Sequence, residues 1–260
     1  MNYRIKQDYL HLCAAVALAA CALAAAVGGH AAERGAGHVA IKRAFDLPPS
    51  ADLHYTIRAS QKGFTLDGTA TVAWRAGEGS YSVSGETRAA IVGKILENRS
   101  EGKVDAYGLA PLTWFERRMR KEASTTSFDR KARSVSFSVG EKTYPLLGGE
   151  QDRASAQWQL AALARAAPDK MVAGSEWRFF VAGRRDAEQW VFKVVAREKI
   201  RTALGTLETV HFSKSPPADD PDQKLDLWLA PAKEWYPVKL RLEEDGGEYI
   251  EQAIQNIKPV

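Results

Sequence analysis

The sequence predicts a mainly β protein: one large, strongly curved antiparallel sheet, a half-barrel or open barrel, with one helix at about residues 152–166. Apolar residues recur at every second position in many segments after residue 50, which is the period of a half-buried strand. Short turns rich in Gly and Asp separate these segments and favour antiparallel pairing of consecutive strands. A single segment has helical periodicity instead. A sheet of this kind covers its apolar face by curling on itself or by folding into a sandwich.

The composition excludes several classes of protein. Hydrophobic residues make up 45% of the chain and charged residues 26%, which excludes general disorder. A mean hydropathy of −0.32 and a single long apolar run exclude a polytopic membrane protein. The net charge of +4 is too small an excess to indicate a nucleic-acid partner.

Residues 1–31 are predicted to be a secretory signal peptide. Arg4 and Lys6 precede an uncharged run over residues 10–29, which ends in the small residues that a signal peptidase accepts. Cleavage after Ala31 predicts an exported, periplasmic protein. An uncleaved transmembrane anchor is the alternative, because the apolar run reaches about 20 residues.

Cys21 offers a second processing route. Residues 18–21, Leu-Ala-Ala-Cys, resemble the lipobox of bacterial lipoproteins, whose cysteine is acylated to give a lipid-anchored protein. The following residues, 22–27, stay apolar where a lipoprotein usually turns polar, which favours simple secretion. We therefore expect membrane association only if Cys21 is acylated or the segment stays uncleaved. Because Cys13 lies in the same segment, cleavage after Ala31 leaves a mature chain without thiols.

Residues 32–46 are small and polar and are interpreted as a linker, and residues 47–260 as a single β-rich domain. In the first strand, Leu53, Tyr55 and Ile57 share one face, and the second strand repeats apolar residues from Phe64 to Trp74. The same pattern predicts further strands near residues 81–83, 94–104, 112–122, 135–139, 177–181, 190–196, 210–212, 225–229, 238–242 and 249–257.

Residues 152–166 break the period-two pattern. Trp158, Leu160, Leu163 and neighbouring alanines recur at three- and four-residue spacing, Asp152 is placed to cap the helix start, and Pro168 follows its end. We expect this helix to cover the open mouth of the curved sheet.

The order of these elements carries a family resemblance. Together with residues 202–209 (TALGTLET), residues 227–231 (LWLAP) and residues 236–238 (YPV), it resembles the proteobacterial family known as domain of unknown function 3108. The resemblance covers nearly the whole mature chain. It implies an exported, mostly β protein with a strongly bent sheet partly closed around a helix, similar in outline to the half-barrels of lipoprotein carriers. It implies no established activity, because a shared outline is a likeness of fold alone.

Motifs that carry chemistry are sparse, and the sequence predicts a non-catalytic protein with no catalytic residue, cofactor or metal. It lacks a Gly-x-Ser-x-Gly elbow, a His-Glu-x-x-His helix, a Walker loop and a dinucleotide fingerprint. His54 and His211 would form a metal site only by converging from distant strands, so we interpret them as ordinary strand histidines. The acidic residues Asp219, Asp220 and Asp222 are interpreted as a solvated loop rather than a calcium site.

Three tryptophans are candidates for a ligand groove. Trp114, Trp228 and Trp235 fall out of step with the apolar faces or lie near turns. Aromatic side chains at the rim of a curved sheet are placed to line an apolar groove. The alternative is that they are packing anchors between strand ends.

The strongest basic segment contains Arg117, Arg118, Arg120 and Lys121. It is a candidate surface patch for anionic lipid head groups or envelope polymers. The alternative is a charged edge strand, on which basic side chains discourage pairing with other chains.

Two functions are compatible with these features. The first is a periplasmic protein that binds an apolar or amphipathic envelope component such as a lipid. The alternative is a structural or protein-interaction module of the cell envelope, which would use edge strands or the basic segment. A concave face fully packed by its own side chains would exclude the first.

Overall fold

The computed structural model describes residues 38–61, 63–214, 224–243 and 247–260. The predicted signal peptide with Cys21, and the acidic loop at residues 219–222, lie outside these ranges. Fifteen strands form one sheet in the order β8-β7-β6-β5-β4-β3-β2-β1-β15-β14-β13-β12-β11-β10-β9. Their bounds are β1 (Ala51–Gln61), β2 (Phe64–Gly77), β3 (Ser80–Ala89), β4 (Gly93–Asp105), β5 (Gly108–Arg118), β6 (Ser124–Asp129), β7 (Ser134–Phe137), β8 (Thr143–Pro145), β9 (Gln151–Asp152), β10 (Glu176–Ala182), β11 (Ala187–Thr202), β12 (Gly205–Lys214), β13 (Lys224–Ala230), β14 (Tyr236–Glu243) and β15 (Tyr249–Pro259).

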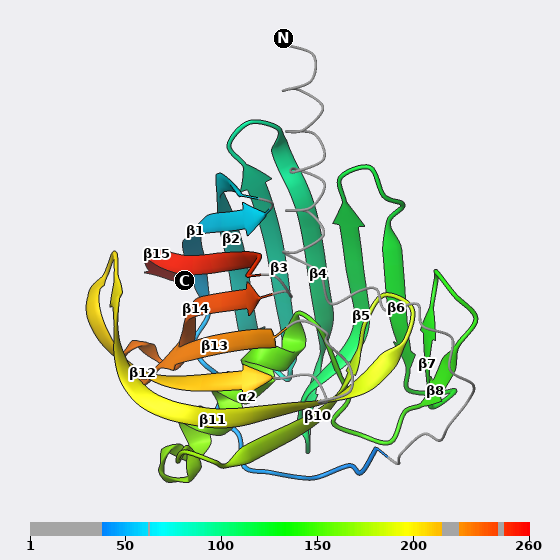
Figure 1. Cartoon of the computed structure of the whole chain (residues 1–260). Helices are drawn as coiled ribbons and strands as arrows, with labels where there is room; N and C mark the ends of the chain where they lie inside the picture. Colours follow the sequence, from blue (N-terminus) through cyan, green and yellow to red (C-terminus); the bar gives the residue numbers. More distant parts are fainter. Residues whose placement is uncertain (1–37, 62, 215–223, 244–246) are drawn as a thin grey trace.

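The sheet is strongly curved but does not close into a barrel by backbone pairing. Its two ends are β8 and β9, and neighbouring strands are antiparallel except for β9 and β10. Strands that follow one another in the chain are neighbours in the sheet, except for β8 and β9, which lie at its two ends; the one pairing between non-consecutive strands joins β1 to β15. That pairing joins β1–β8 to β9–β15, and the combined sheet bends around a helix (Figure 1). The predicted fold class is confirmed.

The period-two pattern of the sequence separates a concave inner face from an outer face. In β1, Leu53, Tyr55 and Ile57 are buried, whereas Thr56 and Arg58 are exposed. The register continues the same face into β2 and then around the sheet. Three tryptophans expected in the core on this basis are buried: Trp74, Trp177 and Trp190.

Helix α2 (Ser155–Ala166) lies inside the curved sheet, and two short 3-10 helices, η1 (Pro168–Lys170) and η2 (Pro231–Lys233), accompany it. It begins at Ser155 rather than at the expected residue 152, because Gln151–Asp152 pair with β10 as β9. Asp152 Oδ1 accepts the N–H groups of Ala154 and Ser155, each at 2.8 Å, and so stabilises the turn before the helix, but the N-cap residue is Ala154, which makes no side-chain capping hydrogen bond. No helix in the described part of the chain has the length and hydropathy needed to cross a membrane.

The core has two parts, one on each side of α2. On one side, the Trp158 ring stacks on Trp74 with centroids 4.4 Å apart. On the other side, Leu160 and Leu163 belong to a cluster with the inner face of β10–β14. The helix thus fills much of the concave face, and its small alanine side chains allow the close approach.

Residues 38–50 run without regular secondary structure along the bottom of Figure 1. Asp46 N donates to Ala162 O at 3.0 Å, which ties the segment to α2. Trp74 Nε1 donates to Pro48 O at 2.9 Å, which ties it to β2. The described part of the predicted linker is therefore anchored to the helix.

The two ends of the sheet meet through side chains at a contact that we call the seam, between β6–β8 and the β10–β11 hairpin. Phe128, Phe137 and Ala182 are buried in it. The Tyr144 ring packs edge-on against Phe180 with centroids 5.6 Å apart. Because β8 and β9 are the ends of the backbone ladder, packing and side-chain hydrogen bonds hold the seam together.

Candidate functional site

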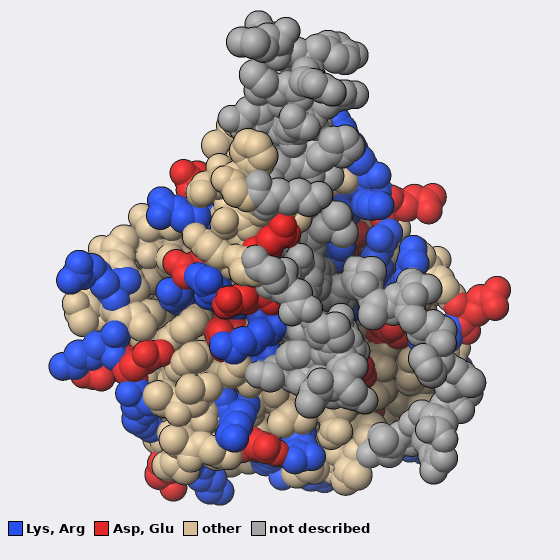
Figure 2. Space-filling model, in the orientation of Figure 1, with Lys and Arg blue, Asp and Glu red and all other residues tan. Residues whose placement is uncertain are grey.

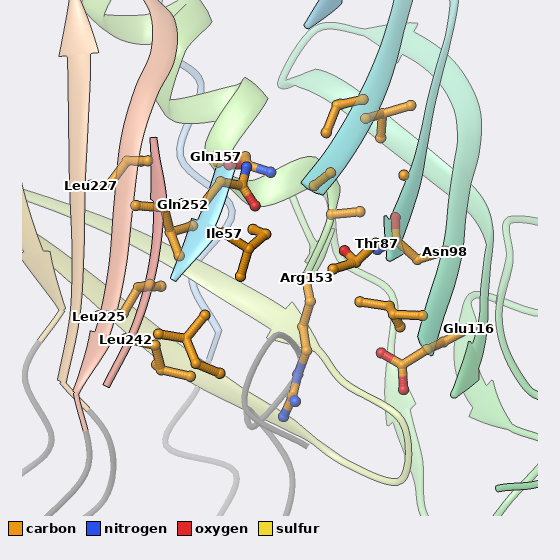
Figure 3. A pocket seen from close by; sticks show the side chains of 18 of the residues that line it. Ile57, Thr87, Asn98, Glu116, Arg153, Gln157, Leu225, Leu227, Leu242 and Gln252 are labelled. Atoms are coloured by element: carbon orange, nitrogen blue, oxygen red, sulfur yellow. The ribbon is translucent and has the colours of Figure 1, made fainter. Parts of the chain in front are cut away.

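A cavity lies between the concave face of the sheet and the start of α2 (Figure 3). Its volume is about 130 Å³. Ligand pockets usually have volumes of roughly 300 Å³ or more. Strands from both halves of the sheet line the cavity, because the β1–β15 pairing makes their inner faces continuous.

One wall of the cavity is apolar. Leu225, Leu227 and Leu242 lie together on one side of Figure 3, and Ile57 adjoins them. They come from β13, β14 and β1, where alternate residues face inward. This wall consists of Ile57, Trp190, Phe192, Leu225, Leu227, Leu240, Leu242 and Ile250. Such a surface gains free energy of about 25 cal/mol for each Å² of apolar ligand surface that it removes from water.

The opposite wall carries polar side chains. Thr87, Asn98 and Glu116 project from β3, β4 and β5 on this side of Figure 3. Arg153 and Gln157, at the start of α2, lie between the two walls. The cavity therefore offers an apolar surface and a polar surface to the same ligand.

Glu116 and Arg118 form a buried ion pair at the polar end. Arg118 Nε donates to Glu116 Oε1 at 2.7 Å, and the side chains of Arg118 and Glu116 are only 4% and 1% exposed. Desolvating two charges costs free energy that their attraction repays only in part. The pair makes this end a candidate for recognising the polar part of a ligand.

Asp152 lies in a buried hydrogen-bond network next to the helix start. Its carboxylate accepts a short hydrogen bond from Ser100 Oγ, and that oxygen lies 2.9 Å from Tyr81 Oη. Burial raises the pKa of Asp152 to about 6, against the opposing effect of its hydrogen bonds with Ser100, Ser155 and Ala154. Asp152 does not line the cavity, so its contacts assign it to holding the helix start.

The structure places the three candidate groove tryptophans in different environments. Trp114 is 2% exposed and lines the cavity. Trp228 lies on the outer face of β13, where its ring stacks on His211 with centroids 4.3 Å apart. Trp235 follows η2 and packs in the core cluster of α2 and β10–β14. The three side chains therefore do not converge on one groove.

The structure also divides the basic segment. Arg118 faces the interior, whereas Arg117 is exposed and lies 3.2 Å from Glu97 Oε2. Arg120 and Lys121 are exposed after β5 ends, and Arg120 has φ 60°, so strand alternation does not extend to them. Figure 2 shows basic and acidic side chains interspersed on the face of the molecule in view.

The histidines in the described ranges do not assemble a metal site. His54 lies on the outer face of β1, and His211 contacts Glu198 and Asp226 on the outer face at 3.2 and 3.0 Å. Among the described residues, no group of three or more His, Cys, Asp or Glu side chains is arranged to hold a metal ion.

Sequence reasoning missed the polar wall. A signal for part of it was present, because Trp114, Glu116 and Arg118 alternate along one strand and must share a face. A tryptophan on the same face as two charges indicates an inward-facing polar site. Arg153 and Asn98 had no comparable signal, since their contribution depends on how α2 and β4 meet.

A family model for proteins of unknown function, DUF3108, matches residues 52–252. This chain belongs to the DUF3108 family. The match spans nearly all of β1 to the first residues of β15, and it includes every residue that lines the cavity. No curated protein matches the DUF3108 chain.

A solved structure resembles this DUF3108 protein in fold, and two others align less well. A β-barrel-like DUF1849 protein from Brucella abortus aligns with a TM-score of 0.54 and 10% identity, covering 85% of this chain and 100% of that one. An outer membrane lipoprotein-sorting protein domain from Vibrio parahaemolyticus aligns with a TM-score of 0.31 and 8% identity, covering 81% and 85%. Lipoprotein LppX from Mycobacterium tuberculosis aligns with a TM-score of 0.27 and 12% identity, covering 80% and 87%. At these identities the likeness to the Brucella protein concerns the fold alone.

Proposed function

We propose that this protein is exported to the periplasm and binds an apolar or amphipathic envelope component, such as a lipid, in the cavity. The observation that carries the proposal is the cavity wall, apolar on one side and polar on the other. Export is supported by the basic start, the uncharged run and the small-residue exit within residues 1–31. The proposal is for binding without catalysis, by the chain from residue 47 onward as one domain.

The cavity is smaller than a whole acyl chain requires. An acyl chain needs more room than about 130 Å³, so the walls must move apart when a whole chain enters. The seam is the place where this costs least, because opening it breaks no backbone ladder.

Mass spectrometry of the protein purified from its native envelope tests export and binding together. We expect a mature chain beginning at Ala32 and a co-purifying lipid in the native spectrum. A chain that begins with an acylated Cys21 would replace simple secretion by lipid anchoring. A protein without any bound envelope molecule would favour the alternative, a structural or protein-interaction module.

A matched pair of variants tests whether the cavity is the binding site. Val72→Phe adds a ring to a cavity-lining residue, and Val195→Phe adds the same ring at an outer-face position that is 46% exposed. We expect Val72→Phe to weaken binding of a fluorescent fatty acid by about tenfold, since overpacking removes the space that the chain needs. Val195→Phe is expected to bind as the unmodified protein does. Equal binding by the two variants would place the ligand elsewhere.

A further inference from the structure

Four buried polar atoms that have no hydrogen-bond partner in the described part of the chain belong to Trp114 and Glu116, which line the cavity, and to Ser124 and Arg184, which lie beside Glu116. They are Trp114 Nε1, Glu116 Oε2, Ser124 Oγ and Arg184 Nε. Trp114 and Glu116 are successive inward residues of β5, and Ser124 of β6 is the register partner of Glu116. Folded proteins satisfy nearly all buried polar atoms, so this cluster indicates a site for a polar group from outside the chain.

The seam brings Arg184 to these strands. Thr126, the register partner of Trp114, donates its hydroxyl to Gly183 O at 2.8 Å. Arg184 follows Gly183 directly, and the charges of Arg118 and Glu116 both act on it. Burial, and then the like charge of Arg118, lower the pKa of the Arg184 guanidinium, as expected where positive charge is in excess.

Arg153 approaches the same place from the helix side. Its guanidinium packs on Gly183, where a Cβ atom would come within 2.7 Å of Arg153 Nε. Gly183 therefore leaves room for this side chain beside Arg184. Arg118 pairs with the buried carboxylate of Glu116, the charge of Glu116 acts on Arg184, and Arg153 lines the same cavity as Glu116. Guanidinium groups bind oxyanions well, because their planar N–H groups match the oxygens in pairs.

We propose that this cluster binds the oxyanion head group, a phosphate or a carboxylate, of a ligand whose apolar chain occupies the cavity; this rests on the proposed function. Trp114 Nε1–H, Arg184 Nε–H and the Ser124 hydroxyl donate to the oxyanion. Glu116 Oε2 accepts from a protonated oxygen or a hydroxyl of the same head group. The ligand is thus an anionic amphiphile, with its head group at the seam and its chain against the apolar wall of the cavity.

Isothermal titration calorimetry with three probes tests this assignment on the intact protein. The probes are dodecyl phosphate and dodecanol, both below their aggregation limits, and inorganic phosphate. We expect dodecyl phosphate to bind at least about tenfold more tightly than either of the other two, because only this probe satisfies the apolar wall and the arginines together.

Two neighbouring arginines provide a matched comparison of variants. Arg184→Gln removes a buried donor and a charge at the cluster, whereas Arg185→Gln removes an exposed charge one residue away. We expect Arg184→Gln to weaken the binding of dodecyl phosphate about tenfold and to change the affinity for dodecanol by no more than about twofold. Arg185→Gln is expected to bind both probes as the unmodified protein does. Trp114→Phe keeps an aromatic ring and removes the Nε1 donor, and it is also expected to weaken the binding of dodecyl phosphate. This second variant keeps the proposal testable if Arg184→Gln does not fold.

The possible outcomes distinguish a failure of the oxyanion site from a failure of the proposed binding in the cavity. Equal affinity for dodecyl phosphate and dodecanol would overturn the oxyanion site while supporting the apolar cavity. Inorganic phosphate binding as tightly as dodecyl phosphate would overturn the assignment to a lipid head group and indicate a free oxyanion. Failure of every dodecyl probe to bind would overturn the proposed function itself.

Discussion

The most unusual residues of this protein are the polar ones buried against its concave face. Glu116, Arg118 and Asp152 are each less than 5% exposed in a part of the fold that apolar side chains otherwise fill. Each has a specific partner, Arg118 with Glu116 and Asp152 with Ser100 and the start of α2. Burial raises the pKa of the Asp152 carboxyl, so the stability of the fold should depend on pH.

Asp152→Asn tests this dependence. The folded-state pKa of Asp152, about 6, lies above its ordinary value of 3.8, so the folded protein binds the proton more tightly than the unfolded chain. The free energy of unfolding from this group is therefore highest below pH 4 and falls by up to about 3 kcal/mol as the pH rises to 6. The substituted amide stays neutral at every pH. Urea unfolding should therefore show the free energy of unfolding of the variant rising relative to that of the unmodified protein between pH 4 and pH 7.

Asp129→Asn is the control for this prediction. Asp129 Oδ1 accepts from Lys131 N and Ala132 N at 2.8 Å, the same kind of contact that Asp152 makes with two backbone N–H groups, but Asp129 is exposed. Because Asp129 is exposed, we expect its substitution to lack the gain in stability between pH 4 and pH 7 that burial produces at Asp152. If the Asp152→Asn difference were constant with pH, burial of the Asp152 carboxyl would have no role in stability.

Among the elements, the seam differs from every other contact in the sheet. Strands β6, β7 and β8 shorten from six residues to four and three, and they meet the β10–β11 hairpin through side chains. The predicted half-barrel did not specify which strands would meet. That outcome depends on the twist accumulated over the whole sheet, which no local pattern encodes.

Thr126→Val tests how the seam is held. The substitution removes the hydrogen bond to Gly183 O at 2.8 Å and leaves that carbonyl buried, at a cost of about 1–3 kcal/mol. We expect faster amide hydrogen exchange in β6–β8, with β1 and β2 unchanged. Thr125→Val, on the other face of the same strand, is the control and should leave exchange as it is. Uniform acceleration over all strands would instead mean that the seam opens only with global unfolding.

At the scale of the whole molecule, the β1–β15 ladder makes one sheet out of two runs of consecutive strands. Ile254 pairs with Tyr55 at its centre and is fully buried. The two runs also share α2, which packs on both parts of the core. We therefore expect the two runs to unfold together.

Ile254→Asp tests this coupling. An unpaired carboxylate at the centre of the ladder should lower the free energy of unfolding by more than about 4 kcal/mol. The same substitution at Ile91, which is 63% exposed in a turn, should change it by less than about 0.5 kcal/mol. Circular dichroism and tryptophan fluorescence should follow one transition for both variants. Separate transitions for Ile254→Asp would mean that each run folds on its own.

Period-two and helical patterns predicted most of the fold from sequence, because they report which side of each element faces the core. Leu53, Tyr55 and Ile57 in β1 and Trp158 in α2 all lie where those patterns placed them. The start of α2 was misplaced, because the pairing of Gln151–Asp152 with β10 is a long-range contact. Alternation predicts Arg117 and Arg118 on opposite faces, and Arg118 turns inward at the end of β5 whereas Arg117 is exposed.

The sequence by itself determined the β class, the single helix of the described chain and the alternation of inner and outer residues, because these depend on local periodicity. Only the tertiary structure decided that Trp114, Glu116 and Arg153 line one cavity and that Ser124 and Arg184 lie beside Glu116. These residues come from β5, β6, the start of α2 and the β10–β11 turn, and no spacing along the chain relates them. Their convergence results from curvature and from the closing of the seam, which are properties of the whole sheet.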